Sequence, residues 1–139
     1  GVNVALGTDG VSSNNCTDLF ADMKIAAILH NGANCVPMAL TAYDALHMAT
    51  VNGARALGRN TGEIKAGCVA DLILVDFSAP NNIPCHDVVE NLVYASHGAD
   101  VRMNMARGRV IYQNGEFFTI DLDRVRREVA DYAMPLLFG

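Results

Sequence analysis

The sequence predicts a mixed α/β fold. A short apolar run, Val2–Leu6, is typical of a buried strand. From Leu19 to Leu29 the apolar residues instead recur with the spacing of one helix face. Beyond Gly58, glycines and prolines separate shorter apolar runs, a pattern typical of strands joined by turns. The chain therefore changes from mainly helical to rich in strands near residue 60.

The first unit along the chain is predicted to be a strand, a loop and a helix. Gly7-Thr8-Asp9-Gly10 is a turn-forming sequence directly after the predicted strand. Asp18 and Asp22 lie near the N-terminus of the predicted helix, where the helix dipole favours negative charge. Asn31-Gly32 is expected to end this helix, because both residues adopt left-handed backbone conformations easily.

A second helical region begins at Thr41. Thr41 and Asp44 have the spacing of a capping box, in which each residue's side chain bonds to the other's backbone N–H. Asn52-Gly53 weakens the helical pattern, since glycine in a helix interior costs about 1 kcal/mol relative to alanine. The pattern resumes and runs to Gly58, so the sequence allows either two short helices or one bent helix.

Turn signals and periodicity define the remaining elements. Arg107-Gly108 and Asn114-Gly115 are hairpin-type turns between apolar runs. Apolar residues after Asp121 follow one helix face, and Pro135 is expected to fray the end of that helix. The predicted strands are Val69–Val75, Val101–Ala106, Arg109–Tyr112 and Glu116–Thr119, and the predicted helices are Asp87–Tyr94 and Asp121–Leu137.

The composition is unusually apolar for so short a chain. Of the 139 residues, 51% are apolar and 18% charged, whereas about 25% are charged in an average soluble domain. A chain of this size buries only about 68–70% of the surface that its unfolded form exposes. We therefore expect another protein surface to cover part of the apolar surface of this chain. A complete (β/α)₈ barrel needs roughly 250 residues, which excludes one here.

The charge and hydropathy patterns limit the partners and the compartment. With 10 Lys and Arg against 15 Asp and Glu, the net charge is −5, and no basic stripe is present to bind nucleic acid. No apolar stretch approaches the roughly 20 residues of a membrane span, and no signal-peptide pattern is recognisable. We therefore expect a soluble, cytoplasmic protein that binds neither nucleic acid nor membranes.

The four cysteines do not form a metal-binding pattern. Cys16, Cys35, Cys68 and Cys85 are widely spaced, and none belongs to a CxxC pair. Reduced, mostly buried thiols are the favoured interpretation, because an intracellular compartment keeps thiols reduced. A framework of two disulfides is the alternative.

Asp9 is the strongest candidate for a functional residue. It follows the carboxyl end of the predicted strand, between two glycines, and α/β proteins bind their ligands at the carboxyl ends of parallel strands. A carboxylate there could bind a metal ion or a substrate. The alternative is an ordinary turn aspartate that bonds to its own backbone.

The histidines do not supply a metal site of their own. They include no HxH, no HExxH and no close pair, and a mononuclear site needs about three or four ligands. His30 and His47 are interpreted as residues of helix surfaces or as partly packed side chains. His97, beside Gly98, lies in a predicted loop, where a functional role is the alternative to a structural one. The four residues are His30, His47, His86 and His97.

Short motifs run through nearly the whole chain in a characteristic order. They are Gly7–Gly10, Ser13–Asn15, Ala49–Gly58, Thr61–Gly67, Ala70–Asp76, Leu92–Tyr94, Gly98–Val101, Gly108–Val110 and Asn114–Glu116. Together they resemble the C-terminal part of metal-dependent amidohydrolases. Within that superfamily they are most similar to the branch of S-adenosylhomocysteine/5′-methylthioadenosine deaminases and related chlorohydrolases.

The resemblance implies that the chain is a C-terminal fragment of a larger fold. Members of the family are (β/α)₈ barrels flanked by a small β-sandwich built from both chain ends. Residues 1–60 would then supply the last barrel strand, the metal-site loop and barrel helices, leaving the barrel incomplete. Residues 61–139 would supply the C-terminal half of the composite sandwich and a terminal helix. Part of the apolar content would face strands that this chain does not contain.

The resemblance also gives Asp9 a role. In the family, the aspartate at this motif position is a metal ligand that takes the proton of the attacking water. Ser13 and Asn14 would shape the floor of the substrate pocket or, together with Asn15, cap the following helix, and capping is the preferred interpretation. The expected reaction is hydrolytic deamination of a purine nucleoside derivative or similar heterocycle, which releases ammonia from a C–N bond that is not a peptide bond.

The other family ligands are missing from this sequence. The HxH pair, two further histidines and the proton-handling glutamate all precede this region in the family. We expect the parent enzyme to hold one divalent metal, zinc with iron as the alternative, and this 139-residue piece neither to bind it nor to be active by itself.

A different class of function remains open. The chain could be a non-catalytic binding or assembly module that uses the sandwich and its apolar surface to pair with another chain. In either case exposed apolar surface predicts a homo-oligomer. The enzyme interpretation alone predicts a small heterocyclic substrate.

Overall fold

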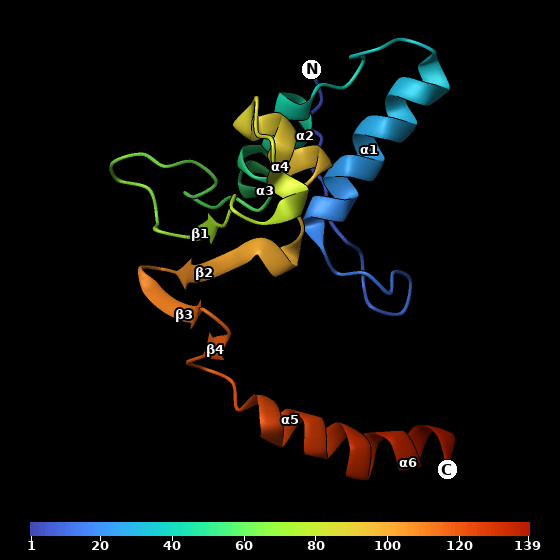
Figure 1. Ribbon diagram of the computed structural model, residues 1–139, viewed down its shortest axis with the longest axis vertical. Helices are drawn as coiled ribbons and strands as arrows, with labels where there is room; N and C mark the ends of the chain where they lie inside the picture. The colour runs from blue at the N-terminus through green and yellow to red at the C-terminus, as the bar shows by residue number, and fades with distance from the viewer.

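The computed structural model describes residues 1–139. A group of helices lies against a small sheet, and a C-terminal helical segment lies away from that group (Figure 1). This arrangement confirms the mixed α/β class. The helices are α1 (Leu19–Asn34), α2 (Ala42–Ala49), α3 (Val51–Ala56), α4 (Val88–Tyr94), α5 (Leu122–Glu128) and α6 (Met134–Phe138). The strands are β1 (Leu72–Val75), β2 (Val101–Ala106), β3 (Arg109–Gln113) and β4 (Glu116–Phe117), and the short helical turns are η1 (Pro80–Asn82), η2 (Gly98–Asp100) and η3 (Val129–Ala133).

The predicted strand at Val2–Leu6 is absent from the structure. This segment is irregular, and Val2 and Val4 are exposed. A strand needs a neighbour along its length, and here the hydrogen bonds of the segment go to helices. The Leu6 N–H donates to the Met48 carbonyl of α2 at 3.0 Å, and Asn52 of α3 donates to the Val4 carbonyl at 2.8 Å. The segment is therefore held beside α2 and α3 without pairing into a sheet.

Helix α1 continues beyond the point where the sequence predicted its end. It runs through Asn31-Gly32 to Asn34, and Cys35 caps it in a left-handed conformation with φ of 50°. The Asn31 side chain is engaged elsewhere, since it accepts from the Leu40 N–H at 2.8 Å and donates to the Leu40 carbonyl at 3.1 Å. Asn31 therefore fixes the returning chain rather than terminating the helix.

The second helical region is two short helices. Thr41 and Asp44 form the predicted capping box at the start of α2. The break falls at Thr50, with φ of −123° and ψ of −88°, whereas Asn52-Gly53 lies inside α3. The Thr50 hydroxyl donates to the Leu46 carbonyl at 2.6 Å, a side-chain bond that competes with the helical backbone pattern. The structure thus has two short helices rather than one bent helix.

The sheet is antiparallel with strands in the order β1-β2-β3-β4. Both predicted hairpin turns are confirmed. Arg107 and Gly108 have φ of 50° and 77°, and Asn114 and Gly115 have φ of 48° and 93°, the positive values of tight two-residue hairpin turns. The strand β4 has two residues and is shorter than predicted. Helix α4, capped by Asp87, lies in the connection between β1 and β2.

The hydrophobic core is small and lies between helices. Val93 of α4 is fully buried among side chains of α1 and α2, so segments on both sides of residue 60 share one core. Only 10 of the 139 residues are buried, which leaves most of the apolar side chains exposed. The core residues are Phe20, Met23, Ala27, Ala42, Ala45 and Val93.

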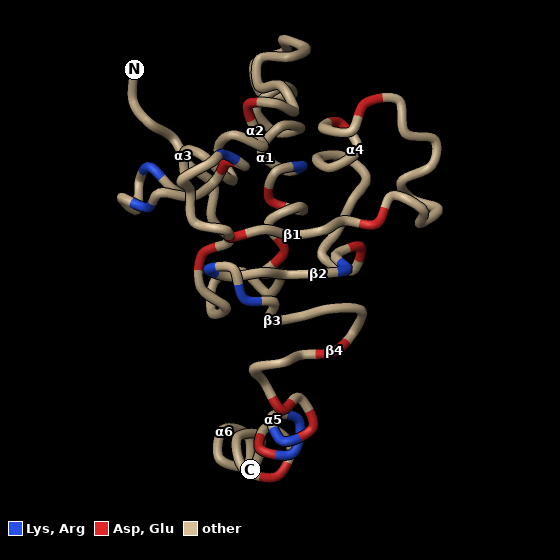
Figure 2. The backbone as a smooth tube through the Cα atoms, turned by 90° about the vertical axis from the view of Figure 1, so that its left-hand side faces the viewer, with Lys and Arg blue, Asp and Glu red and all other residues tan.

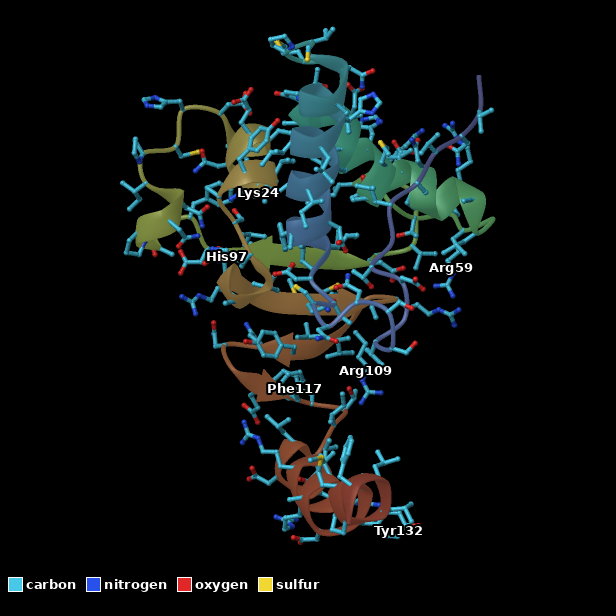
Figure 3. All side chains as sticks on the ribbon, turned by 90° about the vertical axis from the view of Figure 1, so that its right-hand side faces the viewer. Lys24, Arg59, His97, Arg109, Phe117 and Tyr132 are labelled. Carbon is cyan, nitrogen blue, oxygen red and sulfur yellow. The ribbon has the colours of Figure 1, made fainter.

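The C-terminal helical segment is continuous to Phe138, so the prediction that Pro135 frays it is wrong. Pro135 lies in the first turn of α6, where its missing N–H costs little, and the π-helical turn η3 joins α5 to α6. None of this segment is buried. Acidic and basic residues crowd α5, whereas α6 carries none (Figure 2). Tyr132 projects from the segment away from the sheet (Figure 3).

The cysteines are unpaired, but the prediction that they are mostly buried is wrong. Cys16, Cys35 and Cys85 are exposed, and Cys68 is half-buried. All four lie outside the regular elements that form the small core. No helix is both long and apolar enough to span a membrane.

Candidate functional site

The Asp9 loop, residues 7–17, connects the N-terminal segment to α1 and extends beyond the first turn of that helix (Figure 1). Its entrance is held by the Leu6 N–H bond to α2. Its exit is held by Asp18, the N-cap of α1, whose Oδ1 accepts from the Phe20 N–H at 3.0 Å. The loop is thus anchored at both ends by helices of the core.

Asp9 itself is exposed and has a left-handed backbone, with φ of 59°. Aspartate tolerates this conformation better than most residues. Its Oδ1 accepts from the Gly10 N–H at 2.7 Å, the local bond that an ordinary turn aspartate makes. Oδ2 has no hydrogen-bond partner within the chain and remains available to a metal ion, a water or a substrate.

Asn14 makes the side-chain contacts that organise this loop. Its Nδ2 donates to the Thr8 carbonyl at 2.9 Å, and its Oδ1 accepts from the Cys16 N–H at 3.0 Å. The Ser13 side chain makes no hydrogen bond, although its N–H donates to the Gly10 carbonyl at 2.9 Å. Asp18 caps α1, so the preferred interpretation of Ser13, Asn14 and Asn15 as capping residues is wrong.

Asp18 has a second contact that sequence reasoning missed. Its Oδ2 accepts from the Gly98 N–H at 2.8 Å, which ties the end of the Asp9 loop to η2, 80 residues along the chain. The sequence assigned Asp18 only a favourable position in the helix dipole. No local signal indicated the partner, because the bond depends on how η2 packs against α1.

His97 belongs to a different group of polar residues. Its Nδ1 lies 3.2 Å from Oδ2 of Asp100, which is buried. Burial alone would raise the pKa of Asp100, but hydrogen bonds from the His97 N–H, Asn81 and Asn82 outweigh it and hold that pKa below its usual range. Figure 3 places His97 at the end of the sheet next to the helices. All four histidines are exposed, and His30 and His47 lie on helix surfaces as predicted.

Asp76 carries the most strongly perturbed carboxyl group. Hydrogen bonds from the Ser78 hydroxyl at 2.7 Å and the Ser78 N–H at 2.8 Å, together with the Arg102 guanidinium at 2.8 Å, lower its pKa from 3.8 to about 2. The folded state therefore favours the ionised carboxylate, which accepts all of these bonds. Asp76 joins the end of β1 to β2 and is part of the scaffold.

We expect Asp76→Asn to change how stability depends on acidity. Because folding lowers this pKa, the contacts stabilise the fold fully above about pH 4 and lose that contribution as the pH falls towards about 2. The difference in free energy of unfolding between wild type and variant should be largest above pH 4 and should shrink below it. Urea unfolding of the whole protein at a series of pH values measures this. Glu116→Gln, an exposed substitution, is the control, and a pH-independent difference for Asp76→Asn would contradict the prediction.

An apolar groove lies beside the end of the Asp9 loop. It has a volume of about 770 Å³ and lies between the start of α1 and one face of the sheet. Ile73, Ile111 and Phe117 give it an apolar wall. The rings of Tyr112 and Phe117 are 4.9 Å apart at their centres. Figure 3 shows Phe117 at the end of the sheet nearer the C-terminal helical segment. Asn15, Cys16 and Thr17 of the Asp9 loop line it, whereas Asp9, Ser13 and Asn14 do not. The groove therefore begins at the end of the Asp9 loop and does not include Asp9 itself.

The residues of this chain fit one position of a metal site and not a complete one. Asp9 offers a single exposed carboxylate with Oδ2 free. Nowhere do three or more His, Cys, Asp or Glu side chains lie together as a metal site requires. Within these 139 residues, Asp9 therefore has no set of companion ligands that would complete a metal site.

Comparison with known proteins identifies the family to which the chain belongs. The model of the amidohydrolase family matches residues 1–111. The chain belongs to the amidohydrolase family. It is 47% identical over 137 residues to a 5′-deoxyadenosine deaminase of Methanosarcina mazei and covers 32% of that protein, with 99% of the chain matched. It is also 47% identical over 131 residues to a 5-methylthioadenosine/S-adenosylhomocysteine deaminase of Moorella thermoacetica. That alignment covers 93% of the chain and 31% of the relative. These relatives confirm the resemblance to the deaminase branch.

Solved amidohydrolase structures have the same fold over this region. An adenosine deaminase from Xanthomonas campestris with bound zinc matches with a TM-score of 0.93 and 34% identity, covering 99% of the chain and 32% of that structure. The zinc complex of atrazine chlorohydrolase from Arthrobacter aurescens TC1 matches with a TM-score of 0.86 and 27% identity, covering 94% of the chain and 30% of that structure. The chain thus spans about a third of the length of these amidohydrolases.

Proposed function

We propose that the whole protein containing this chain is a metal-dependent deaminase of adenosine-derived nucleosides. The observation that carries the proposal is the 47% identity, across 99% of the chain, to a 5′-deoxyadenosine deaminase. The reaction is hydrolysis of a C–N bond that is not a peptide bond, with release of ammonia. Its substrate is a small heterocyclic molecule.

In this proposal the chain supplies the C-terminal part of a (β/α)₈ barrel and its flanking sandwich. Residues 1–60 provide the last barrel strand, the metal-site loop and barrel helices, and residues 61–139 provide the C-terminal part of the sandwich with its terminal helix. The TM-score of 0.93 to a longer deaminase supports this assignment. The unpaired segment Val2–Leu6 would then form a strand with neighbours outside the 139 residues.

Asp9 would be one metal ligand and the residue that accepts the proton of the attacking water. A divalent ion, zinc or alternatively iron, lowers the pKa of a bound water towards about 7. Oδ2 of Asp9 is free to hold a proton, while the Gly10 N–H keeps Oδ1 in place. Transfer of that proton to the departing amine would complete the role of Asp9 as general base and acid. Ser13 and Asn14 would lie beside the substrate pocket.

The exposed apolar surface supports two further proposals. A homo-oligomer of a cytoplasmic protein would cover part of the apolar side chains that the chain leaves exposed. The same surface also favours the alternative function, a non-catalytic binding or assembly module. The two functions differ in whether the whole protein turns over a substrate.

An assay of the whole, zinc-loaded protein tests the proposed function. We expect ammonia release from 5′-deoxyadenosine, 5′-methylthioadenosine or S-adenosylhomocysteine, measured by a coupled assay and by loss of adenine absorbance. Atrazine, with chloride release as the readout, serves as the probe for a chlorohydrolase. Turnover of atrazine alone would overturn the deaminase proposal, and no turnover of any substrate by fully zinc-loaded protein would favour the assembly module.

A further inference from the structure

We infer that Asn14 is a positioning residue that fixes the direction of the Asp9 carboxylate. This inference rests on the proposed function, because it assumes that Asp9 acts on a metal-bound reactant. It goes beyond that function by assigning a role to a side chain that acts through the loop backbone on either side of Asp9. The argument comes from the contacts on either side of Asp9.

Asn14 holds both residues that flank Asp9. Its side-chain Nδ2 donates to the Thr8 carbonyl at 2.9 Å, immediately before Asp9. Its backbone N–H donates to the Gly10 carbonyl at 3.0 Å, immediately after Asp9. The Thr8 carbonyl belongs to the peptide directly before Asp9, and the Gly10 carbonyl belongs to the peptide that follows Gly10. Asn14 therefore holds the turn on both sides of Asp9 and restricts its positive φ and the direction of its Cα–Cβ bond.

The carboxylate is then oriented by one further bond. The Gly10 N–H donates to Oδ1 at 2.7 Å, so Oδ2 is the oxygen that faces away from the loop backbone. The Gly10 carbonyl, one peptide further along, accepts from the N–H groups of Ser13 and Asn14, so the turn is closed directly after that N–H. If this turn shifts, the Gly10 N–H moves and the Asp9 carboxylate turns with it.

The Asn14 side chain has little freedom to do anything else. Its Oδ1 accepts from the Cys16 N–H at 3.0 Å, so both ends of the amide are occupied. The Thr8 carbonyl requires a donor and the Cys16 N–H requires an acceptor. The amide of Asn14 is therefore oriented with Nδ2 towards Thr8 and Oδ1 towards Cys16. Asn14 is half-buried, whereas the other residues from Asp9 to Thr17 are exposed.

Loss of Asn14 should loosen the middle of the loop without unfolding the chain. The two ends are fixed independently, by the Leu6 bond to Met48 and by the Asp18 bond to Gly98. The core cluster contains no residue of the loop. The expected effect therefore falls on the site rather than on global stability.

The test uses the whole zinc-loaded protein and the variants Asn14→Ala and Asn14→Asp. Removing a residue that orients a metal ligand typically costs about 10–100-fold in metal affinity or activity. We expect Asn14→Ala to weaken zinc affinity and to lower kcat, each by at least about tenfold, with KM within about twofold and an unchanged melting temperature of the metal-free protein. Asn14→Asp keeps the acceptor for Cys16 but loses the donor to Thr8, and should show the same losses.

Control variants separate the possible outcomes. Ser12→Ala alters an exposed side chain of the same loop that makes no hydrogen bond and should behave as wild type. Wild-type zinc affinity and kcat in both Asn14 variants would overturn the inference. If Asn14→Ala fails to fold, Asn14→Asp decides alone. Wild-type zinc affinity in Asp9→Asn would instead overturn the assignment of Asp9 as a ligand, whereas the proposed function fails only if the wild-type protein releases no ammonia.

Discussion

Replacing Asp9 with asparagine should lower kcat/KM for deamination by the whole protein by about 10²–10⁴-fold, the usual contribution of a general acid–base group. Asparagine keeps the size of the side chain and its bond from the Gly10 N–H, but it cannot accept the proton of the attacking water. It also removes the negative charge that a divalent metal prefers. The rate of ammonia release and the zinc content after dialysis measure the two effects.

The control for this substitution is Asp131→Asn. Asp131 is an exposed aspartate of the C-terminal helical segment that makes no hydrogen bond or ion pair, so its loss should leave both kcat/KM and zinc content unchanged. Full activity of Asp9→Asn would remove Asp9 from the site. Loss of activity with normal zinc content would leave Asp9 as a proton carrier that is not needed as a ligand.

The 139-residue chain by itself should show no deamination and no specific zinc binding. A mononuclear site needs about three or four ligands, and the structure brings no three His, Cys, Asp or Glu side chains together. Isothermal titration calorimetry with zinc measures metal binding, and an ammonia assay with 5′-methylthioadenosine measures deamination. Circular dichroism of the same sample reports whether the helices have formed.

The whole protein under identical conditions is the positive control for that experiment. Ammonia release by the 139-residue chain with added zinc, at a rate that scales with chain concentration, would contradict the prediction. It would mean that this chain assembles a catalytic centre from residues that lie apart in the structure. Persistence of that activity in Asp9→Asn would identify a contaminating enzyme.

Local signals in the sequence predicted much of the secondary structure. The hairpin turns at Arg107-Gly108 and Asn114-Gly115 were correct, because two-residue turns with positive φ depend only on the residues that form them. The capping box of Thr41 and Asp44 was correct for the same reason, since both partners lie within one helical turn. After residue 60, hydrophobic periodicity together with the two hairpin turns predicted the order of strands and main helices that the structure has.

Signals that depend on distant partners failed. Val2–Leu6 has the composition of a strand, but pairing needs a second strand and none lies beside it in this chain. Asn31-Gly32 has the composition of a helix end, but Asn31 bonds to Leu40 and the helix continues. The thiols were expected inside, but the core is too small to hold them.

The sequence by itself determined the family of the chain, its mixed α/β class and the importance of Asp9 as a candidate. Those features depend on the order of motifs and on residues that are neighbours along the chain. Only the tertiary structure decided how the Asp9 loop is held. Asn14 reaches back six residues to Thr8, and Asp18 receives the Gly98 N–H from 80 residues away. Such bonds form only when packing brings their partners within about 3 Å, a condition that no local pattern encodes.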